Sequence, residues 1–186
     1  MTPIVKFPFS FDATHLQADV GAFAPEEWIS HFNTHIYQGD WSGIALRASA
    51  DAHVALSPDP TAENFIDTDL MARCAYVPEV LSAFECELKS VRFLKLGAGA
   101  VIQRHRDYML GLEDGEIRIH IPVSTNPQVE FILDDQKVEM QEGEAWYLNF
   151  NLYHSVRNEG ATDRIHLVID CVVNDWMLSN LSEQPA

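Results

Sequence analysis

Residues 116–123 read Glu-Ile-Arg-Ile-His-Ile-Pro-Val, and residues 164–171 read Arg-Ile-His-Leu-Val-Ile-Asp-Cys. Apolar and polar side chains alternate in both stretches, and successive side chains of a β-strand point to opposite faces. Each stretch therefore predicts a strand with one apolar face and one face that carries His, Arg or Asp. Burying these polar groups without partners would be very costly, so we expect them to be paired or to bind a ligand.

The parity of the two strands divides their side chains into two sets. The apolar set is Ile117, Ile119, Ile121, Ile165, Leu167 and Ile169. The polar set is Arg118, His120, Arg164, His166 and Asp170. We expect helices to cover the apolar faces and the polar faces to line the interior of a β-roll, where a metal and an anion would satisfy them.

Five more short β-prone runs, bounded by Gly, Asn and Asp, complete the second half of the chain. They span residues 91–96, 101–108, 129–133, 137–140 and 144–149. Asp134-Asp135-Gln136 reads as a hairpin connection. About seven short strands at this spacing predict a mainly β fold, a double-stranded β-helix (jelly roll) over residues 90–173.

The 186 residues predict one domain, in which residues 1–89 form a mixed helical and irregular part covering the roll and residues 174–186 form a tail. Helical spacing of apolar residues predicts a helix over 25–38, which begins at Pro25, and a second helix over 78–88. Residues 40–75 read as irregular. Such a long connection predicts a segment that lines or covers a pocket.

Charge and composition exclude several classes of partner. The chain has 12 Lys and Arg against 28 Asp and Glu, a formal charge of −16 that disfavours nucleic acids and anionic membranes. No apolar run reaches the roughly 18 residues of a membrane span, and we expect no secretory leader. Cys74, Cys86 and Cys171 lack CxxC spacing and read as reduced structural thiols, so we expect a cytoplasmic protein.

A candidate metal site combines His105 and Asp107, written His-Arg-Asp, with His154 about fifty residues downstream. Two His and one carboxylate form the ligand set of a mononuclear Fe(II) centre that leaves positions open for a cosubstrate and O₂. An H-x-D pair alone is weak evidence, because such pairs occur by chance on surfaces. Its position on a predicted strand, with a distal His near the end of the roll, strengthens the assignment.

Arginines near these ligands suggest an anionic cosubstrate. Arg164 follows His154 by ten residues, and its planar guanidinium could hold the far carboxylate of 2-oxoglutarate or instead pair with a neighbouring Asp. Two roles are open for Arg118 and His120 as well: they could bind the cosubstrate, or they could pair with local carboxylates. Arg47 is an isolated cation that could bind a substrate carboxylate, although an arginine in this setting is more often a surface residue.

The remaining histidines and large aromatic residues are expected to have packing or surface roles. This group comprises His15, His31, His35, His53, His166, Trp146, Tyr147 and Trp176.

Several segments of the second half, in one order, resemble the aspartyl/asparaginyl β-hydroxylase family, a cupin-like group of Fe(II)/2-oxoglutarate-dependent dioxygenases. The resemblance covers roughly residues 90–173, and the stretch 143–158 is similar to the second cupin motif. The segments are Gly97-Ala98-Gly99-Ala100, Arg118-Ile119-His120-Ile121-Pro122, Gly143-Glu144-Ala145-Trp146, His154-Ser155-Val156-x-Asn158, and Arg164 with Leu167-Val168-Ile169-Asp170.

The resemblance implies that His105 and His154 bind iron and that Arg164 and the Arg118-x-His120 pair hold 2-oxoglutarate. The animal enzymes of the family lack a carboxylate at the position of Asp107, whereas its bacterial relatives have one. The chain also resembles small bacterial proline hydroxylases, which favours a free amino acid or small acid over a protein as substrate.

These observations predict a dioxygenase that hydroxylates an unactivated C–H bond of an amino acid or amino-acid residue, with succinate and CO₂ as coproducts. Two alternatives remain at this point. One is a metal-dependent cupin that does not use 2-oxoglutarate, either a cosubstrate-independent dioxygenase or an isomerase. The other is a ligand-binding cupin without enzymatic activity. The pattern does not specify an oligomeric state.

Overall fold

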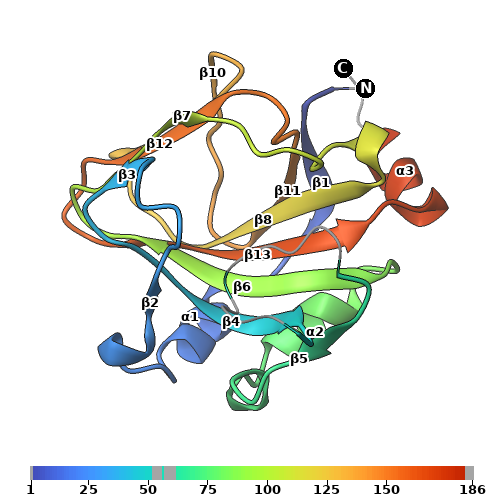
Figure 1. Ribbon diagram of the computed structural model, residues 1–186, viewed down its shortest axis with the longest axis horizontal. Coiled ribbons are helices and arrows are strands. Elements are labelled where there is room, and N and C mark those ends of the chain that lie inside the picture. The colour runs from blue at the N-terminus through green and yellow to red at the C-terminus, as the bar shows by residue number, and fades with distance from the viewer. Residues whose placement is uncertain (1, 52–55, 57–61, 183–186) are drawn as a thin grey trace.

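The structure, a computed structural model, describes residues 2–51, 56 and 62–182. Within these residues thirteen strands form two antiparallel sheets that face each other as a jelly roll (Figure 1). The larger sheet is ordered β1 (Ile4–Ser10), β11 (Glu144–Leu148), β8 (Glu116–Ser124), β13 (Arg164–Val172), β6 (Leu88–Leu96), β4 (Trp41–Ser49) and β2 (Ile29–Ser30), with β5 (Phe65–Asp67) beside β4. The smaller sheet is ordered β10 (Gln136–Lys137), β9 (Val129–Leu133), β12 (His154–Asn158), β7 (Val101–His105) and β3 (Tyr37–Gln38).

The outer face of the larger sheet carries the main apolar core. Helices α1 (Ala13–Val20) and α2 (Val77–Ser82) lie beneath this face, and α3 (Asp175–Ser182) packs near β1 (Figure 1). The six apolar residues that parity assigned to one face of β8 and β13 all belong to this core. The prediction that helices cover this face is therefore confirmed.

The inner face of the larger sheet is polar and buried. Arg118 and His120 on β8, and Arg164, His166 and Asp170 on β13, are each 9% exposed or less. They point into the space between the sheets, as their parity predicts. The two faces of the same strands thus serve different purposes, one apolar and packed against helices, the other charged and turned toward the smaller sheet.

The helix predicted over 25–38 is wrong. The chain makes a single 3₁₀ turn at Pro25–Glu27, in which Glu27 accepts a hydrogen bond from the main-chain N–H of Ala24. It then pairs with β4 through β2 and with β7 through β3. The segment is rich in weak helix formers such as Ile, His, Phe, Asn and Thr, so strand pairing prevails over the chance helical spacing of its apolar residues.

The irregular segment predicted over 40–75 is also wrong, because it contains β4, a long strand of the larger sheet. Residues 41–46 are buried, and β4 pairs with β6 along most of its length. The strand is hard to recognise from the sequence because it contains small residues, which are also common in loops. A Cβ at Gly43 would lie 2.8 Å from the main-chain oxygen of Phe93, so the absence of a side chain permits the close approach of the two strands.

Several further elements differ from the expectations or were not expected. The helix predicted over 78–88 ends at Ser82, and Leu88 already begins β6. Strands β1 and β12 and helices α1 and α3 were not predicted. The hairpin at Asp134 and Asp135 is confirmed: both residues have positive φ angles, 48° and 60°, as a tight connection between β9 and β10 requires.

Candidate active site

Three predicted ligands meet at the end of two paired strands of the smaller sheet. His105 ends β7 and His154 begins β12, and the two residues are direct partners in the antiparallel register. Asp107 follows two positions after His105. One ligand atom from each of the three residues lies within 4.8 Å of the others, and this is the one such cluster of three found among the described residues.

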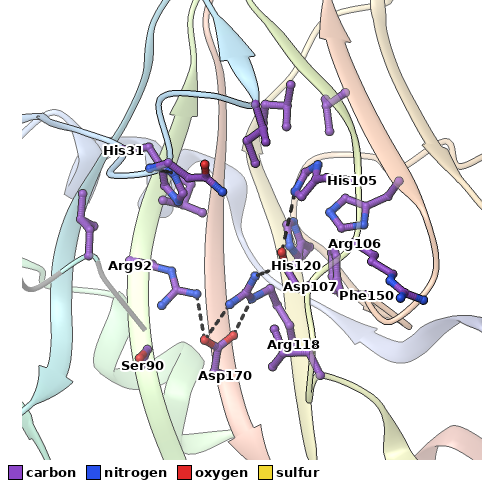
Figure 2. Close-up of a pocket in the computed structure, with 18 of the residues that line it drawn as sticks. His31, Ser90, Arg92, His105, Arg106, Asp107, Arg118, His120, Phe150 and Asp170 are labelled. Carbon is purple, nitrogen blue, oxygen red and sulfur yellow. Dashed lines mark hydrogen bonds and ion pairs between the residues drawn. The ribbon is translucent and has the colours of Figure 1, made fainter. Parts of the chain in front are cut away.

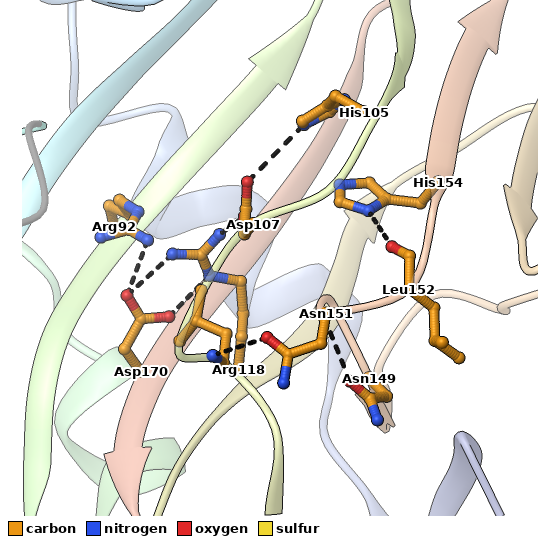
Figure 3. A network of polar contacts seen from close by, with 10 residues as sticks. Arg92, His105, Asp107, Arg118, Asn149, Asn151, Leu152, His154 and Asp170 are labelled. Atoms are coloured by element: carbon orange, nitrogen blue, oxygen red, sulfur yellow. Dashed lines mark hydrogen bonds and ion pairs between the residues drawn. The ribbon is translucent and has the colours of Figure 1, made fainter. Parts of the chain in front are cut away.

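Both imidazole rings are oriented by hydrogen bonds to main-chain oxygens. His105 Nδ1 lies 2.7 Å from the oxygen of Gln103. His154 Nδ1 lies 3.1 Å from the oxygen of Leu152, a contact that Figure 3 shows. A carbonyl oxygen can only accept, so Nδ1 donates in both rings and each Nε2 keeps its lone pair for an ion. Burial and the neighbouring His105 lower the pKa of His154 to about 4, so this ring is neutral at neutral pH.

The carboxylate of Asp107 is held between the two sheets. Its Oδ2 accepts a hydrogen bond from Arg118 Nη1 at 2.6 Å, and its Oδ1 lies 3.7 Å from His105 Nε2 (Figure 3). Arg118 is itself fixed by Asp170, which accepts from Nε at 2.6 Å and from Nη2 at 3.0 Å. Two imidazole nitrogens and one oriented carboxylate oxygen match the donor set of a mononuclear non-haem Fe(II) site.

A cavity of about 440 Å³ opens beside these ligands, between the two sheets (Figure 2). Five buried side-chain polar atoms have no hydrogen-bond partner among the described residues. Four of the five belong to residues that border this cavity: Trp41, Arg92, His120 and Arg164. A buried polar atom without a partner costs about 1–3 kcal/mol, so their gathering around one cavity indicates a polar ligand.

Arg164 is the predicted cosubstrate residue, and the structure buries it at 3% exposure. Its Nη2 donates to His166 Nδ1 at 2.9 Å, its Nε has no partner among the described residues, and the Phe131 ring centroid lies 5.8 Å away. Burial lowers the pKa of Arg164 to about 9. No carboxylate of the described residues makes an ion pair with this guanidinium, as expected of a site that awaits an anion.

His120 lies in the same buried row, stacked on the Phe150 ring at 5.0 Å between centroids. Its Nδ1 lies 3.1 Å from His166 Nδ1, and its Nε2 has no partner in the part of the chain described. Burial and then Arg164 hold the pKa of His120 well below its ordinary value. His166 is a buried residue with hydrogen bonds, as the sequence analysis expected.

Arg118 borders the cavity, and three of its nitrogens are engaged by carboxylates. Its Nε, Nη1 and Nη2 donate to Asp170 and Asp107, so pairing with local carboxylates, the second reading of this residue, is what the structure shows. This geometry makes Arg118 a positioning residue for the Asp107 carboxylate.

Sequence reasoning missed two residues that border the cavity. Arg92 lies on the inner face of β6 and donates from Nη2 to Asp170 Oδ2 at 2.8 Å. The parity that identified Arg118 and Arg164 also applies to β6 and would have found it. His31 was expected to be a packing or surface residue, but it lines the cavity with its ring stacked on Trp41 at 3.5 Å.

Arg47 is not among the residues that line the cavity. It donates to Asp67 Oδ1 at 2.7 Å and to the main-chain oxygens of Phe65 and Leu88, which fixes it between β4 and its neighbours. A substrate role for Arg47 therefore has no support from its position. His53 lies outside the described residues, and none of the helices described has the length and apolar character needed to cross a membrane.

Comparisons with known proteins agree with this geometry. L-Proline cis-4-hydroxylase of Rhizobium meliloti (strain 1021) is 27% identical over 165 residues, which make up 86% of this chain and 57% of that protein. The chain thus spans little more than half the length of this relative. A 2OG-Fe(II) oxygenase family oxidoreductase from Burkholderia pseudomallei has a similar structure, with a TM-score of 0.58 and 15% identity over 91% of this chain and 85% of its own.

SnoN, a non-heme α-ketoglutarate-dependent epimerase from nogalamycin biosynthesis, also has a TM-score of 0.58, with 12% identity over 99% of this chain and 87% of its own. These structural likenesses show the cupin-like jelly roll. A family model described as aspartyl/asparaginyl beta-hydroxylase matches residues 12–173, which extends the likeness beyond the roll to most of the chain. The chain belongs to the aspartyl/asparaginyl β-hydroxylase family.

Proposed function

We propose that this protein is an Fe(II)/2-oxoglutarate-dependent dioxygenase that hydroxylates an unactivated C–H bond of a small amino acid. The observation that carries the proposal is the convergence of His105 Nε2, His154 Nε2 and the Asp107 carboxylate beside a cavity that contains a buried, carboxylate-free Arg164. When bound, Fe(II) supplies the redox chemistry by which O₂ oxidises 2-oxoglutarate to succinate and CO₂ and hydroxylates the substrate.

The residues that would hold the cosubstrate are Arg164 and His120. The guanidinium of Arg164 offers a planar pair of donors that suits a carboxylate, and burial strengthens its attraction for one. His120 places a second unpartnered nitrogen on the same cavity. A diacid with one end at the ligand cluster and the other at Arg164 would pair with this guanidinium.

The other contributions of the chain are positioning and the exclusion of water. Arg118 holds Asp107 in its ligand orientation, and the two main-chain oxygens hold the imidazoles. Phe131 and Phe150 make part of the cavity wall apolar around His120 and His154. Such walls keep a reactive site dry and direct its oxidant toward the bound substrate.

The relative from Rhizobium meliloti is an L-proline cis-4-hydroxylase, which supports an amino-acid substrate for this chain. The buried anion site favours a 2-oxoglutarate enzyme over a cupin that needs no cosubstrate, because Arg164 would otherwise remain uncompensated. Turnover of the cosubstrate would exclude a non-enzymatic binding protein. A cytoplasmic location remains a prediction.

A titration of the protein with Fe(II) and 2-oxoglutarate without oxygen tests the proposal. We expect a weak visible charge-transfer band, followed by succinate release when oxygen is admitted. The variant His105→Ala should lose both signals, whereas His15→Ala, which removes an exposed imidazole on α1, should keep them. Equal signals in the two variants, or no succinate from the wild type, would refute the proposal.

A second pair of variants, one at the proposed site and one control, tests the cosubstrate site. Arg164→Ala should raise the KM for 2-oxoglutarate by about 10- to 100-fold, the loss of a charge-assisted contact. Arg157→Ala removes an exposed arginine from β12 and should leave this KM unchanged. An unchanged KM in Arg164→Ala would refute the role of Arg164, whereas turnover that needs no 2-oxoglutarate at all would support the cupin that does not use it.

A further inference from the structure

Arg92 is a second buried arginine whose hydrogen bonds are incomplete. It is 4% exposed; Nη2 is bound to Asp170, while Nη1 has no partner among the described residues. The residue borders the cavity, and Figure 2 shows its guanidinium on the side of the cavity formed by Ser90 and Asp170. Ser90, Arg92 and Leu94 alternate along β6 and face inward together.

The charges around Arg92 do not cancel once Asp107 serves as a metal ligand. With the charge of Asp107 taken up by the metal, Arg92 and Arg118 have one further carboxylate between them, that of Asp170, which accepts three hydrogen bonds from these two guanidiniums. Glu116 also borders the cavity, but it is paired with Lys89. One positive charge remains in surplus at this end of the cavity, and a buried surplus charge attracts an anion.

This surplus is separate from the anion site at Arg164. In the sheet register Arg92 lies opposite Val168, and Arg164 lies four residues away along β13. At the rise of a β-strand the two backbone positions are about 13 Å apart. The distance is large enough for two anions to occupy the cavity together, one at each arginine.

We infer that Arg92 receives the carboxylate of the primary substrate, and that the substrate is therefore an amino acid with a free α-carboxylate rather than a residue within a polypeptide. The inference rests on the proposed function, because it assigns the second anion site only after Arg164 has been given to 2-oxoglutarate. An internal residue of a polypeptide presents a neutral amide where a free amino acid presents its charge. An internal residue without an acidic side chain would leave Arg92 Nη1 without an ionic partner.

A comparison of matched substrates on the wild-type protein tests the inference without any mutation. The twenty amino acids and their α-carboxamides, L-proline and L-prolinamide included, would be assayed for succinate release above the rate without substrate. We expect at least one free acid to stimulate release, and its amide to have a kcat/KM lower by about 10- to 100-fold, as the loss of a charge-assisted contact predicts. Equal stimulation by acid and amide would overturn the inference.

Two variants locate the site. Arg92→Gln leaves Asp170 paired with Arg118, so the protein should fold, and its preference for acid over amide should fall toward one while its KM for 2-oxoglutarate stays unchanged. Arg92→Lys keeps the charge and should recover part of the preference. If Arg47→Gln, rather than Arg92→Gln, abolished the preference, the carboxylate site would lie between β4 and β5.

The outcomes separate failure of the inference from failure of the proposed function. Absence of succinate under every condition refutes the function itself. Succinate release that no free amino acid stimulates, or an Arg92→Gln variant that alters the KM for 2-oxoglutarate instead of the substrate preference, leaves the function in place and refutes the role of Arg92.

Discussion

The two faces of the larger sheet come from alternate residues of the same strands, yet they differ in almost every physical respect. The outer face is apolar, is covered by helices and contains the main core. The inner face places Arg92, Arg118, His120, Arg164 and Asp170 in a buried cavity, where one nitrogen each of Arg92, His120 and Arg164 has no hydrogen-bond partner within the described part of the chain. The outer face provides stability, whereas the inner face retains unfavourable groups that a metal and two anions would satisfy.

This difference shows how a small β domain can keep a charged site without losing its fold. Because successive side chains of a strand point to opposite faces, one strand can contribute to both layers without any distortion of its backbone. Substitutions on the two faces should therefore have separate effects, on unfolding free energy for one and on turnover for the other.

The largest expected effect concerns the metal ligands. His154→Ala should reduce succinate release to background, because it removes one of three ligand atoms. His35→Ala, in an exposed loop, is the matched control and should retain activity. Release measured at saturating Fe(II) provides the test, and substantial activity in His154→Ala would contradict the assignment of this ligand.

On the outer face, Ile119→Ala should destabilise the protein by about 2–5 kcal/mol, because it leaves a cavity in a fully buried core. Its kcat/KM per folded molecule should remain near that of the wild type. Denaturant unfolding and succinate assays on the same samples would show both quantities. A large loss of kcat/KM at full folding would mean that the two faces are not independent.

Arg118 lies on the inner face, borders the cavity and donates a hydrogen bond to the predicted ligand Asp107. Arg118→Lys should weaken Fe(II) binding by about 10- to 100-fold, the usual consequence of removing a group that orients a metal ligand. Excess Fe(II) should restore much of the turnover. If the variant instead raised the KM for 2-oxoglutarate with unchanged Fe(II) affinity, Arg118 would be a cosubstrate residue, as the family resemblance implies.

The smallest effect concerns the response of Asp170 to acid. Burial alone would raise the pKa of Asp170, but Arg118 and Arg92 outweigh it and hold the pKa at about 2, below the ordinary 3.8. A depressed carboxyl pKa stabilises the folded state above the ordinary value, and this stability is lost as the pH falls from 3.8 to 2. The advantage of the wild type over Asp170→Asn in unfolding free energy should therefore shrink by about 2 kcal/mol between pH 5 and pH 2. A constant difference would contradict the ion-pair account.

Much of the roll and its ligand cluster could be predicted, because the alternation of side chains along a strand and the spacing of a ligand motif are both recognisable in the sequence. Ile117, Ile119 and Ile121 alternate with Arg118 and His120, and the predicted strand over 101–108 puts His105 and Asp107 on one side. In the structure β7 ends at His105, and Asp107 lies just beyond it. The patterns in the first half of the chain are weaker. Strand β4 contains small residues of the kind that are common in loops. Residues 25–38 have apolar side chains at helical intervals, but the two short strands within this segment pair with different sheets.

The role of Arg118 could not have been predicted from its own strand. Parity places it in the cavity, but its partner depends on Asp107, which lies just beyond a strand of the opposite sheet. Likewise, His31 reaches the cavity only because the segment around it crosses between the sheets. Contacts between segments far apart in the chain decide both roles, and local pattern carries no information about them.

Strand β6 offers a practical route for redesign. The ligand atoms come from β7, from β12 and from Asp107, which ends the His-Arg-Asp motif just after β7, whereas Ser90 and Leu94 flank Arg92 on a separate strand of the other sheet. If Arg92 holds the substrate as proposed, substitutions at these two positions would reshape the compartment beside it without altering the residues proposed to hold iron and 2-oxoglutarate. A laboratory evolution campaign for new hydroxylated amino acids would reasonably begin there.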